Sequence, residues 1–232
     1  MGVIATVNIP VGDHITRTIY GMTFNVDTIW TTALAGVIVI TLGLVMRVKL
    51  TAGVPGGLQL FFESLVDFVE ELVESSIGKR ASRLVPLAVA LFLFILTANW
   101  LSLIPSGFPK EYLPAPAADV NTTYALAVLV IIIVHGAGFR AKKLGYLKHF
   151  VNPLHLIEEI TKPITLTLRL FGNLFAGGLM VALIGALLPV YLVWLVDFMW
   201  KVFDMFVGGI QAFIFALLTI VYFGLAAEKT HG

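Results

Sequence analysis

Long apolar runs divide this chain, and three of them have the length of a helix that crosses a bilayer. Crossing about 30 Å of hydrocarbon takes roughly 20 helical residues, and only helices or closed barrels satisfy the backbone within lipid. Runs of this length lie at 28–47, 84–104 and 122–140. We expect each of them to be a single transmembrane helix.

Two further apolar runs, 154–188 and 191–227, are much longer and are separated by Pro189. At 1.5 Å per residue each would be about 50 Å long as a helix, which exceeds the thickness of the hydrocarbon core. A helix of this length must tilt or bend to stay in the membrane. We therefore expect a long, strongly tilted helical hairpin.

The segment 58–78 has a different pattern, because its acidic residues recur at helical spacing on one face and its other face is apolar. This pattern predicts a strongly amphipathic helix. A helix lying in the membrane interface is the plainer interpretation, a partner-binding helix is the alternative, and the two are compatible. The acidic face consists of Glu63, Asp67, Glu70, Glu71 and Glu74.

Composition supports a membrane location. The chain is 59% hydrophobic and 12% charged and has no cysteine, whereas soluble domains carry about 25% charged residues. These values exclude an ordinary soluble enzyme, a disordered chain, a disulfide scaffold and a thiolate metal site. We predict an all-α integral membrane protein with a single membrane domain over 1–232, five transmembrane helices and one amphipathic interfacial helix.

Basic residues beside short loops set the orientation of membrane proteins. Lysine and arginine flank the segment 58–78 and recur in the loop 141–153, so both are expected on the cytoplasmic side. The N-terminal segment 1–26 and the proline-rich loop 105–121 then lie outside, and the C-terminus lies inside. The start of the chain lacks the features of a removable signal peptide, so we expect 1–26 to be retained.

Arg169 lies deep within an apolar run, where an ionised side chain costs roughly 2.5 to 3.5 kcal/mol on insertion scales. Steps of three and four residues give each long segment one polar face. The first face runs from the cytoplasmic end to mid-helix, and the second runs from outside to mid-helix. The first contains Glu158, Lys162, Thr165, Arg169 and Asn173, and the second contains Asp197, Lys201, Asp204, Gly208 and Gln211.

A hairpin that turns near Val190 gives a register for these two faces. Arg169 lies 21 residues before the turn and Gln211 lies 21 residues after it, so the two should face each other. The same register predicts that Gly172 meets Gly208 and Gly209, because small residues let helix backbones approach closely. It also places Gly177 and Gly178 near Asp204.

Together the faces describe two half-channels that enter from opposite sides of the membrane and do not join. A guanidinium is effectively always protonated, so Arg169 cannot relay a proton and repels one that passes directly. The ion must then be carried by a mobile carboxylate, and because this chain offers none, a partner protein is expected. The alternative is that these polar residues only hold the helices together, with Arg169 paired to Glu158 or Asp204. Both acids lie two or three turns away, which argues against that pairing.

Other candidate sites are weaker. His135 is a lone histidine in an apolar span and is more typical of helix packing than of metal binding. Glu158 and Glu159 are either the mouth of the inner half-channel or a solvated helix end. No histidine pair has zinc-ligand spacing, no phosphate-binding loop is present, and net charge is only +1. We expect no metal, no cofactor and no nucleic-acid partner.

The stretches NPLHLIEEITKPITLTLRLFGNLFAGG and IQAFIFALLTIVYF resemble subunit a of F-type ATP synthases, and NWLSLIP and DVNTTYALA extend the resemblance over most of the chain. It implies a stator subunit that conducts protons and is not a catalyst alone. Arg169 would be the essential residue facing the ion-carrying carboxylate of a rotating c-ring. Asn173 and Gln211 match positions that line the path near this arginine.

The chain departs from the family pattern at three positions. Gly178 stands where many members carry Glu or His, and Asp204 stands where His or Glu is common, so Asp204 alone would supply the ionisable group of the outer half-channel. Ser102 replaces an acidic residue found in some members. The predicted lining of the two half-channels is completed by Asn99, Ser102, Glu158, Glu159 and Lys162.

The resemblance also implies partners and a location. The partners would be the c-ring, b-type peripheral stalk subunits, membrane lipid and, indirectly, the F1 sector that performs nucleotide chemistry. The expected location is an energy-transducing membrane, the plasma membrane of a bacterium. A free-standing ion-coupled secondary transporter is the alternative, although no internal repeat of the kind such transporters show is found.

Overall fold

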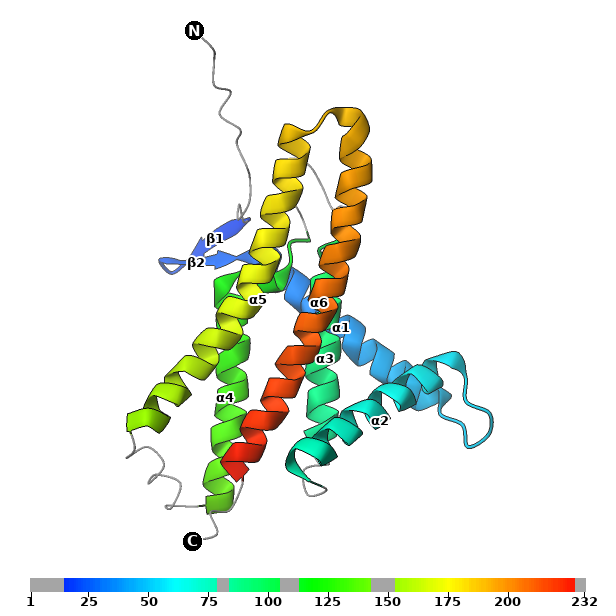
Figure 1. Ribbon diagram of the computed structural model, residues 1–232, viewed down its shortest axis with the longest axis vertical. Coiled ribbons are helices and arrows are strands. Elements are labelled where there is room, and N and C mark those ends of the chain that lie inside the picture. Colours follow the sequence, from blue (N-terminus) through cyan, green and yellow to red (C-terminus); the bar gives the residue numbers. More distant parts are fainter. Residues whose placement is uncertain (1–14, 79–83, 105–112, 143–152, 228–232) are drawn as a thin grey trace.

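The computed structural model describes residues 15–78, 84–104, 113–142 and 153–227 (Figure 1). Most of the predicted segment 1–26, parts of the two loops at 105–121 and 141–153, and several basic residues used for orientation lie outside these ranges. In chain order the elements are β1 (Thr16–Ile19), β2 (Met22–Asn25), α1 (Val26–Lys49), α2 (Gly57–Ile77), α3 (Val85–Leu101), the 3-10 helix η2 (Pro116–Ala118), α4 (Val120–Lys142), α5 (Pro153–Leu187) and α6 (Val190–Ala227).

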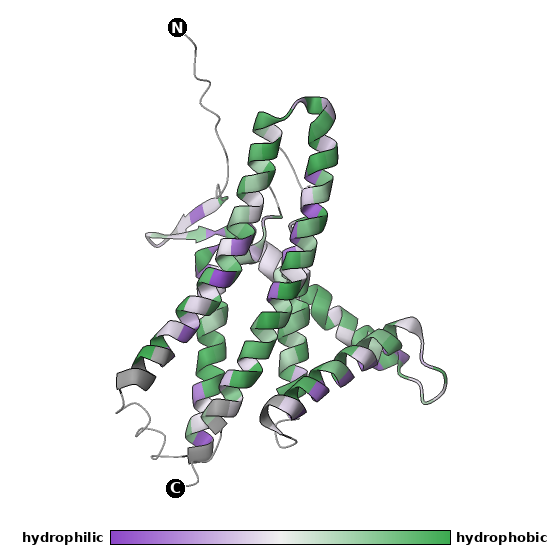
Figure 2. Cartoon of the chain, in the orientation of Figure 1, coloured by the Kyte–Doolittle hydropathy of each residue, from purple (hydrophilic) through white to green (hydrophobic). Residues whose placement is uncertain are grey.

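Four of the described helices, α1, α4, α5 and α6, are long and apolar enough to cross a membrane. Helix α3 is also apolar but has only 17 residues. Figure 2 shows apolar residues over most of these helices, whereas α2 carries both apolar and polar residues. Many large apolar side chains on the outside are uncovered by the chain, as Trp194 is at 79% exposure. This is the surface expected of a protein whose solvent is lipid.

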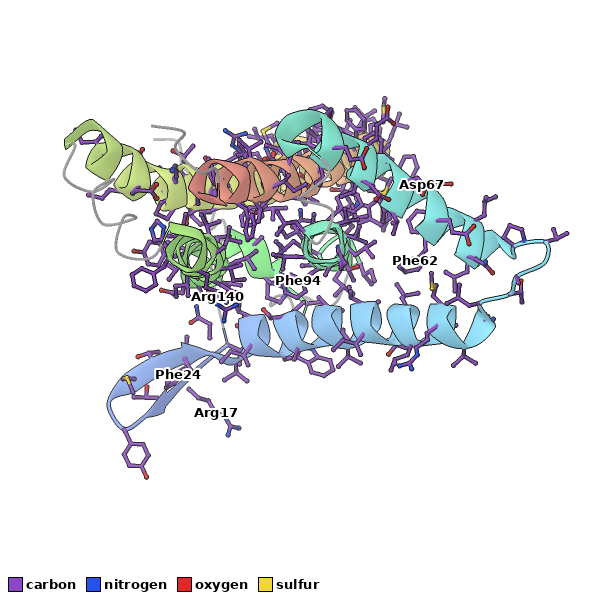
Figure 3. All side chains as sticks on the ribbon, turned by 90° about the horizontal axis from the view of Figure 1, so that it is seen from below. Arg17, Phe24, Phe62, Asp67, Phe94 and Arg140 are labelled. Atoms are coloured by element: carbon purple, nitrogen blue, oxygen red, sulfur yellow. The ribbon has the colours of Figure 1, made fainter. Side chains whose placement is uncertain are left out.

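The helices form three layers (Figure 3). Helix α1 lies on one side, α3 and α4 lie in the middle, and α5 and α6 lie on the other side. The largest buried cluster joins α3, α4, α5 and α6, with Ile95, Val130, Leu166 and Phe215 among its members. Helix α2 crosses toward α1 at one end of the bundle.

Helix α2 has the two faces that the sequence predicts. Phe62, Val69 and Val73 are buried against α3 and the neighbouring parts of α1 and α6. The ring of Phe68 contacts the ring of Phe213 of α6, with centroids 5.7 Å apart. Asp67 lies on the outer side of the helix and is exposed (Figure 3). The apolar face of α2 is therefore covered at least in part by the protein itself.

A β-hairpin precedes α1, and the sequence analysis did not predict it. Strands β1 and β2 pair antiparallel around Tyr20 and Gly21, whose φ angles are 51° and 79°. Positive φ at both central residues is typical of the tight turn that matches strand twist. The Asn25 side chain donates to a carboxylate oxygen of Asp119 at 2.6 Å, which ties the hairpin to the start of α4.

Asp119 also explains why α4 begins at Val120 and not at the predicted residue 122. Its carboxylate accepts the backbone N–H of Asn121 at 2.8 Å, and its carbonyl accepts the N–H of Thr123 at 3.1 Å. An aspartate that accepts a backbone donor of the first turn is a typical N-cap. The cap therefore starts the helix two residues earlier than hydropathy alone indicates.

Helices α5 and α6 are joined by Leu188 and Pro189 and run side by side in opposite directions (Figure 1). The predicted contact between Gly172 and the pair Gly208 and Gly209 is wrong. A Cβ on Gly172 would meet nothing within 4 Å, whereas one on Gly208 would lie 3.3 Å from the Asn99 Cβ of α3. The small residues of α6 therefore allow a close approach to α3, because α6 turns that face toward the middle layer.

Candidate functional site

Arg169 lies near the middle of α5, and its side chain is exposed on the outside of the chain. Other exposed side chains of this part of α5 are the apolar Ile164 and Leu168, which are 45% and 61% exposed. Within the described parts of the chain, Arg169 makes no hydrogen bond or ion pair. The alternative pairing with Asp204 is therefore not formed, and the side chain of Glu158 lies outside what the structure describes.

Two amides belong to the predicted polar faces, Asn173 one turn beyond Arg169 on α5 and Gln211 on α6. Asn173 Nδ2 and Gln211 Oε1 are both buried and have no hydrogen-bond partner among the described residues. Buried polar atoms nearly always have a partner, which is often an ordered water. The two amides therefore mark places where water or a partner's polar group would be favourable.

Asp204 lies where α6 passes Gly177 of α5. A Cβ built on Gly177 would come within 2.8 Å of Asp204 Oδ1, so the carboxylate occupies the space that any larger residue would need. One turn earlier on α6, the Trp200 indole N–H donates to the carbonyl of Gly177 at 3.2 Å. Gly178, the other glycine predicted near Asp204, has an exposed position.

The other charged residues of this face of α6 neutralise each other. Lys201 Nζ lies 3.2 Å from Asp197 Oδ2, one turn away on the same helix. Asp204 makes no ion pair with any described residue. Asp204 is thus the ionisable group on this face whose charge the described part of the chain does not balance.

Asn99 and Ser102 take different roles at the end of α3. Asn99 is 3% exposed, its amide N–H donates to the Gly208 carbonyl at 3.1 Å, and its Oδ1 has no partner among the described residues. The Ser102 hydroxyl donates to the Asn99 carbonyl at 2.7 Å. The hydrogen bond of Ser102 therefore lies within the end of α3. Asn99 links α3 to α6, and its buried Oδ1 is available as a hydrogen-bond acceptor.

A second group of polar residues lies near the opposite end of α5. Lys162 Nζ contacts Glu159 Oε1 at 2.5 Å, and His135 Nε2 of α4 lies 3.5 Å from Glu159 Oε2. The Lys162 ammonium lies 5.2 Å from the centre of the Tyr222 ring of α6. We call His135, Glu159, Lys162 and Tyr222 the inner cluster. Glu159 is therefore a buried member of a polar cluster and not a solvated helix end.

Comparison with known proteins shows the family of this chain. A family model described as the ATP synthase A chain matches residues 28–224. The chain belongs to this family. The subunit a of Acidothermus cellulolyticus ATP synthase is 48% identical over 238 residues, covering 99% of this chain and 87% of the relative. The subunit a of Mycobacterium tuberculosis is 50% identical over 241 residues, covering 97% and 96%.

A more distant relative, subunit a of the Desulforamulus reducens ATP synthase, is 38% identical over 180 residues, covering 72% of this chain and 66% of the relative. Family membership makes the chain a proton-translocating stator subunit of the membrane sector of ATP synthase, embedded in the membrane. It is a channel subunit of the rotary complex and is not catalytic by itself. The free-standing transporter is not favoured.

The sequence did not indicate the partners of three residues near the predicted site. Trp100 donates its indole N–H to the Met205 carbonyl at 3.2 Å, and Trp200 donates in the same way to Gly177. His135, which the sequence predicts to serve helix packing, faces Glu159 of the neighbouring helix α5. Each contact joins residues more than 20 positions apart on different helices, so no local pattern could have revealed it.

Proposed function

We propose that this chain forms two offset half-channels beside a rotating c-ring, with Arg169 between them. Helix α3 would be the fifth membrane span beside the four longer ones, α2 would lie at the cytoplasmic interface, and α5 and α6 would form a strongly tilted hairpin. The N-terminus would be outside and the C-terminus in the cytoplasm of a bacterium. Partners would be the c-ring, b-type stalk subunits and, indirectly, the F1 sector.

The observation that carries the proposal is the position of Arg169. Arg169 is exposed on a helix rich in apolar residues, and its side chain has no partner among the described residues of its own chain. A cation facing the hydrocarbon interior is costly unless it is paired or reaches water. A carboxylate on a neighbouring membrane protein would pair with it. A rotating ring that carries such carboxylates would bring them to Arg169 one after another.

The outer half-channel would begin at Asp204 and continue toward the polar atoms of Asn99, Gln211 and Asn173. Asp204 has no ion-pair partner in the described chain, so it can accept and release a proton without breaking a salt bridge. The buried, unpartnered amide atoms can each hold a water on the way to the ring. A proton that arrives there would neutralise a ring carboxylate, which could then enter lipid.

The inner half-channel would begin on the other side of Arg169. After almost a full turn the ring carboxyl would lose its proton toward Lys162, Glu159 and Glu158 and pass Arg169 as an anion. Because guanidinium does not release its proton, it would block direct passage between the two half-channels. A potential of 100 mV supplies about 2.3 kcal/mol for each charge that takes this route.

The test replaces Arg169 in the assembled ATP synthase reconstituted into liposomes. Arg169→Lys keeps the charge but loses the planar, bidentate fork, so coupled synthesis should fall by roughly tenfold or more. Arg140→Lys, the same change at the exposed end of α4, is the control and should keep nearly normal synthesis. Near-normal synthesis by Arg169→Lys, in complexes that retain all subunits, would refute the proposed role.

A further inference from the structure

The inner cluster brings titratable side chains from three helices to one place. Glu159 and Lys162 lie one turn apart on α5, His135 comes from α4, and Tyr222 comes from α6. Glu159 is 9% exposed, whereas the side chain of His135 is 30% exposed. The acid is therefore enclosed, and the imidazole is the most open member that contacts it.

The two oxygens of Glu159 have different partners. Oε1 contacts the ammonium of Lys162 at 2.5 Å, and Oε2 faces the imidazole of His135 at 3.5 Å. Lysine keeps its charge at neutral pH, whereas histidine is the side chain that changes charge between about pH 5 and 8. One oxygen thus has a constant charged partner and the other has a partner that can gain or lose a proton.

The cluster lies on one side of Arg169 along α5. Glu159 precedes Arg169 by ten residues, which is about 15 Å along a helix. The cluster is therefore placed between the fixed guanidinium and the end of the bundle at which α5 begins.

We propose that His135 and Glu159 form the proton-exchange pair of the inner half-channel, with Lys162 as the counter-cation. This inference rests on the proposed function, because it names the residues that complete that half-channel. A proton released by the ring reaches Glu159 Oε2 through water and converts the carboxylate to the acid. It then passes to His135 Nε2, the imidazolium forms, and the other ring nitrogen, Nδ1, releases one proton to water.

The described charged and titratable groups near His135 come from three helices. On α5 it faces Glu159 with Lys162 beside it, α6 contributes Tyr222, and Arg140 lies further along α4 with an exposed position. With neutral histidine the Glu159 and Lys162 charges cancel, and with imidazolium the cluster carries one net positive charge. Departure of that proton to water restores the neutral state.

A purely structural contact between His135 and Glu159 predicts different behaviour. Glutamine at position 135 still provides an N–H donor to Glu159 but does not titrate. A structural contact would therefore survive the substitution with its function intact. Proton exchange would not, because the amide cannot take up a proton at neutral pH.

The experiment uses the intact ATP synthase in liposomes and measures ATP-driven proton pumping while pH is varied on the F1 side. In His135→Gln the rate should fall on the order of 10²-fold, as for loss of a positioned acid–base group, and should lose its dependence on pH between about 5 and 8. Ile131→Gln, one turn away on α4 and also half-buried, is the control and should keep the native pH profile.

A double-mutant comparison tests the pair itself. If His135 and Glu159 act in sequence, His135→Gln combined with Glu159→Gln should be no slower than the slower single variant, because coupled residues are not additive. If the fold-losses in rate of the two single variants multiplied in the double variant, the two residues would act independently and the pairing would be overturned. A native rate and pH profile in His135→Gln would overturn the proposal outright. If that variant does not assemble, His135→Asn supplies the same comparison with a smaller amide.

The inference and the proposed function fail in different ways. Arg169→Ala in the same assay should abolish pumping while subunit content stays normal. Pumping by Arg169→Ala would refute the half-channel arrangement, whatever His135 does. If Arg169→Ala is inactive and His135→Gln behaves as the native protein, only the assignment of the exchange pair is wrong.

Discussion

The carboxylate of Asp204 lies directly against the backbone of Gly177, so that a Cβ on Gly177 would come within 2.8 Å of Oδ1. The absence of a side chain on α5 creates the space that the acid of α6 occupies. Trp200 donates to the carbonyl of the same glycine, which keeps the two helices in this register. This glycine contact therefore coincides with the proposed entrance of the outer half-channel.

Gly177→Ala should displace Asp204, because the added methyl group would overlap the carboxylate. Overpacking of this kind costs typically about 1–3 kcal/mol, and we expect a clear loss of proton pumping with most of the complex still assembled. Gly185→Ala, further along α5 where a Cβ would meet nothing within 4 Å, is the control. Equal pumping by the two variants would contradict this role of Gly177.

Asp204→Asn should remove the ionisable group of the outer half-channel with little change in shape. We expect proton-driven ATP synthesis to fall on the order of 10²-fold, because an amide cannot accept the proton. Asp197→Asn makes the same change on the same helix, at an acid already neutralised by Lys201, and should retain most synthesis. If Asp197→Asn lowered ATP synthesis more than Asp204→Asn did, Asp204 would not be the group at which protons enter.

The α5–α6 register can be tested by disulfide formation, since the native chain has no cysteine. Cysteines at 177 and 204 should form a disulfide readily under mild oxidation, because their side-chain positions lie in contact. Cysteines at 177 and 211 should react poorly, because a disulfide requires Cα atoms within about 7 Å and position 211 lies almost two turns further along α6. Comparable yields from both pairs would contradict the register.

Asn99→Leu should impair proton pumping more than Ser102→Ala does. The first change removes the hydrogen bond to Gly208 and a buried acceptor, and the second removes only a bond within the end of α3. We expect the Asn99 variant to lose about 1 kcal/mol of stability and much of its pumping rate. Similar rates for the two variants would place both residues outside the half-channel.

Hydropathy and residue counting predicted much of this arrangement. The six helices lie close to their predicted ranges, and the register counted from a turn near Val190 predicts Asp204 near Gly177, where the structure has it. Arg169 stood out because a charge within an apolar run is costly. These features depend on length, period and composition, which local sequence determines.

Features that depend on contacts between distant segments were not predictable. Gly208 faces Asn99 and not Gly172 because packing against α3 sets the rotation of α6 about its own axis. The pairing of His135 with Glu159 depends on how α4 packs against α5. The hydrogen bond of Trp200 likewise depends on the folded α5–α6 hairpin, because its acceptor, the carbonyl of Gly177, lies 23 residues earlier.

The charge of Arg169, which has no partner among the described residues, also matters for the subunit before it is assembled. A newly inserted copy without its neighbour presents a guanidinium to lipid, at the cost that any lone intramembrane charge carries. The side chain that we propose lies between the two half-channels would thus also distinguish an orphan subunit from an assembled one. Membrane quality control could recognise that difference without any dedicated degradation signal in the chain.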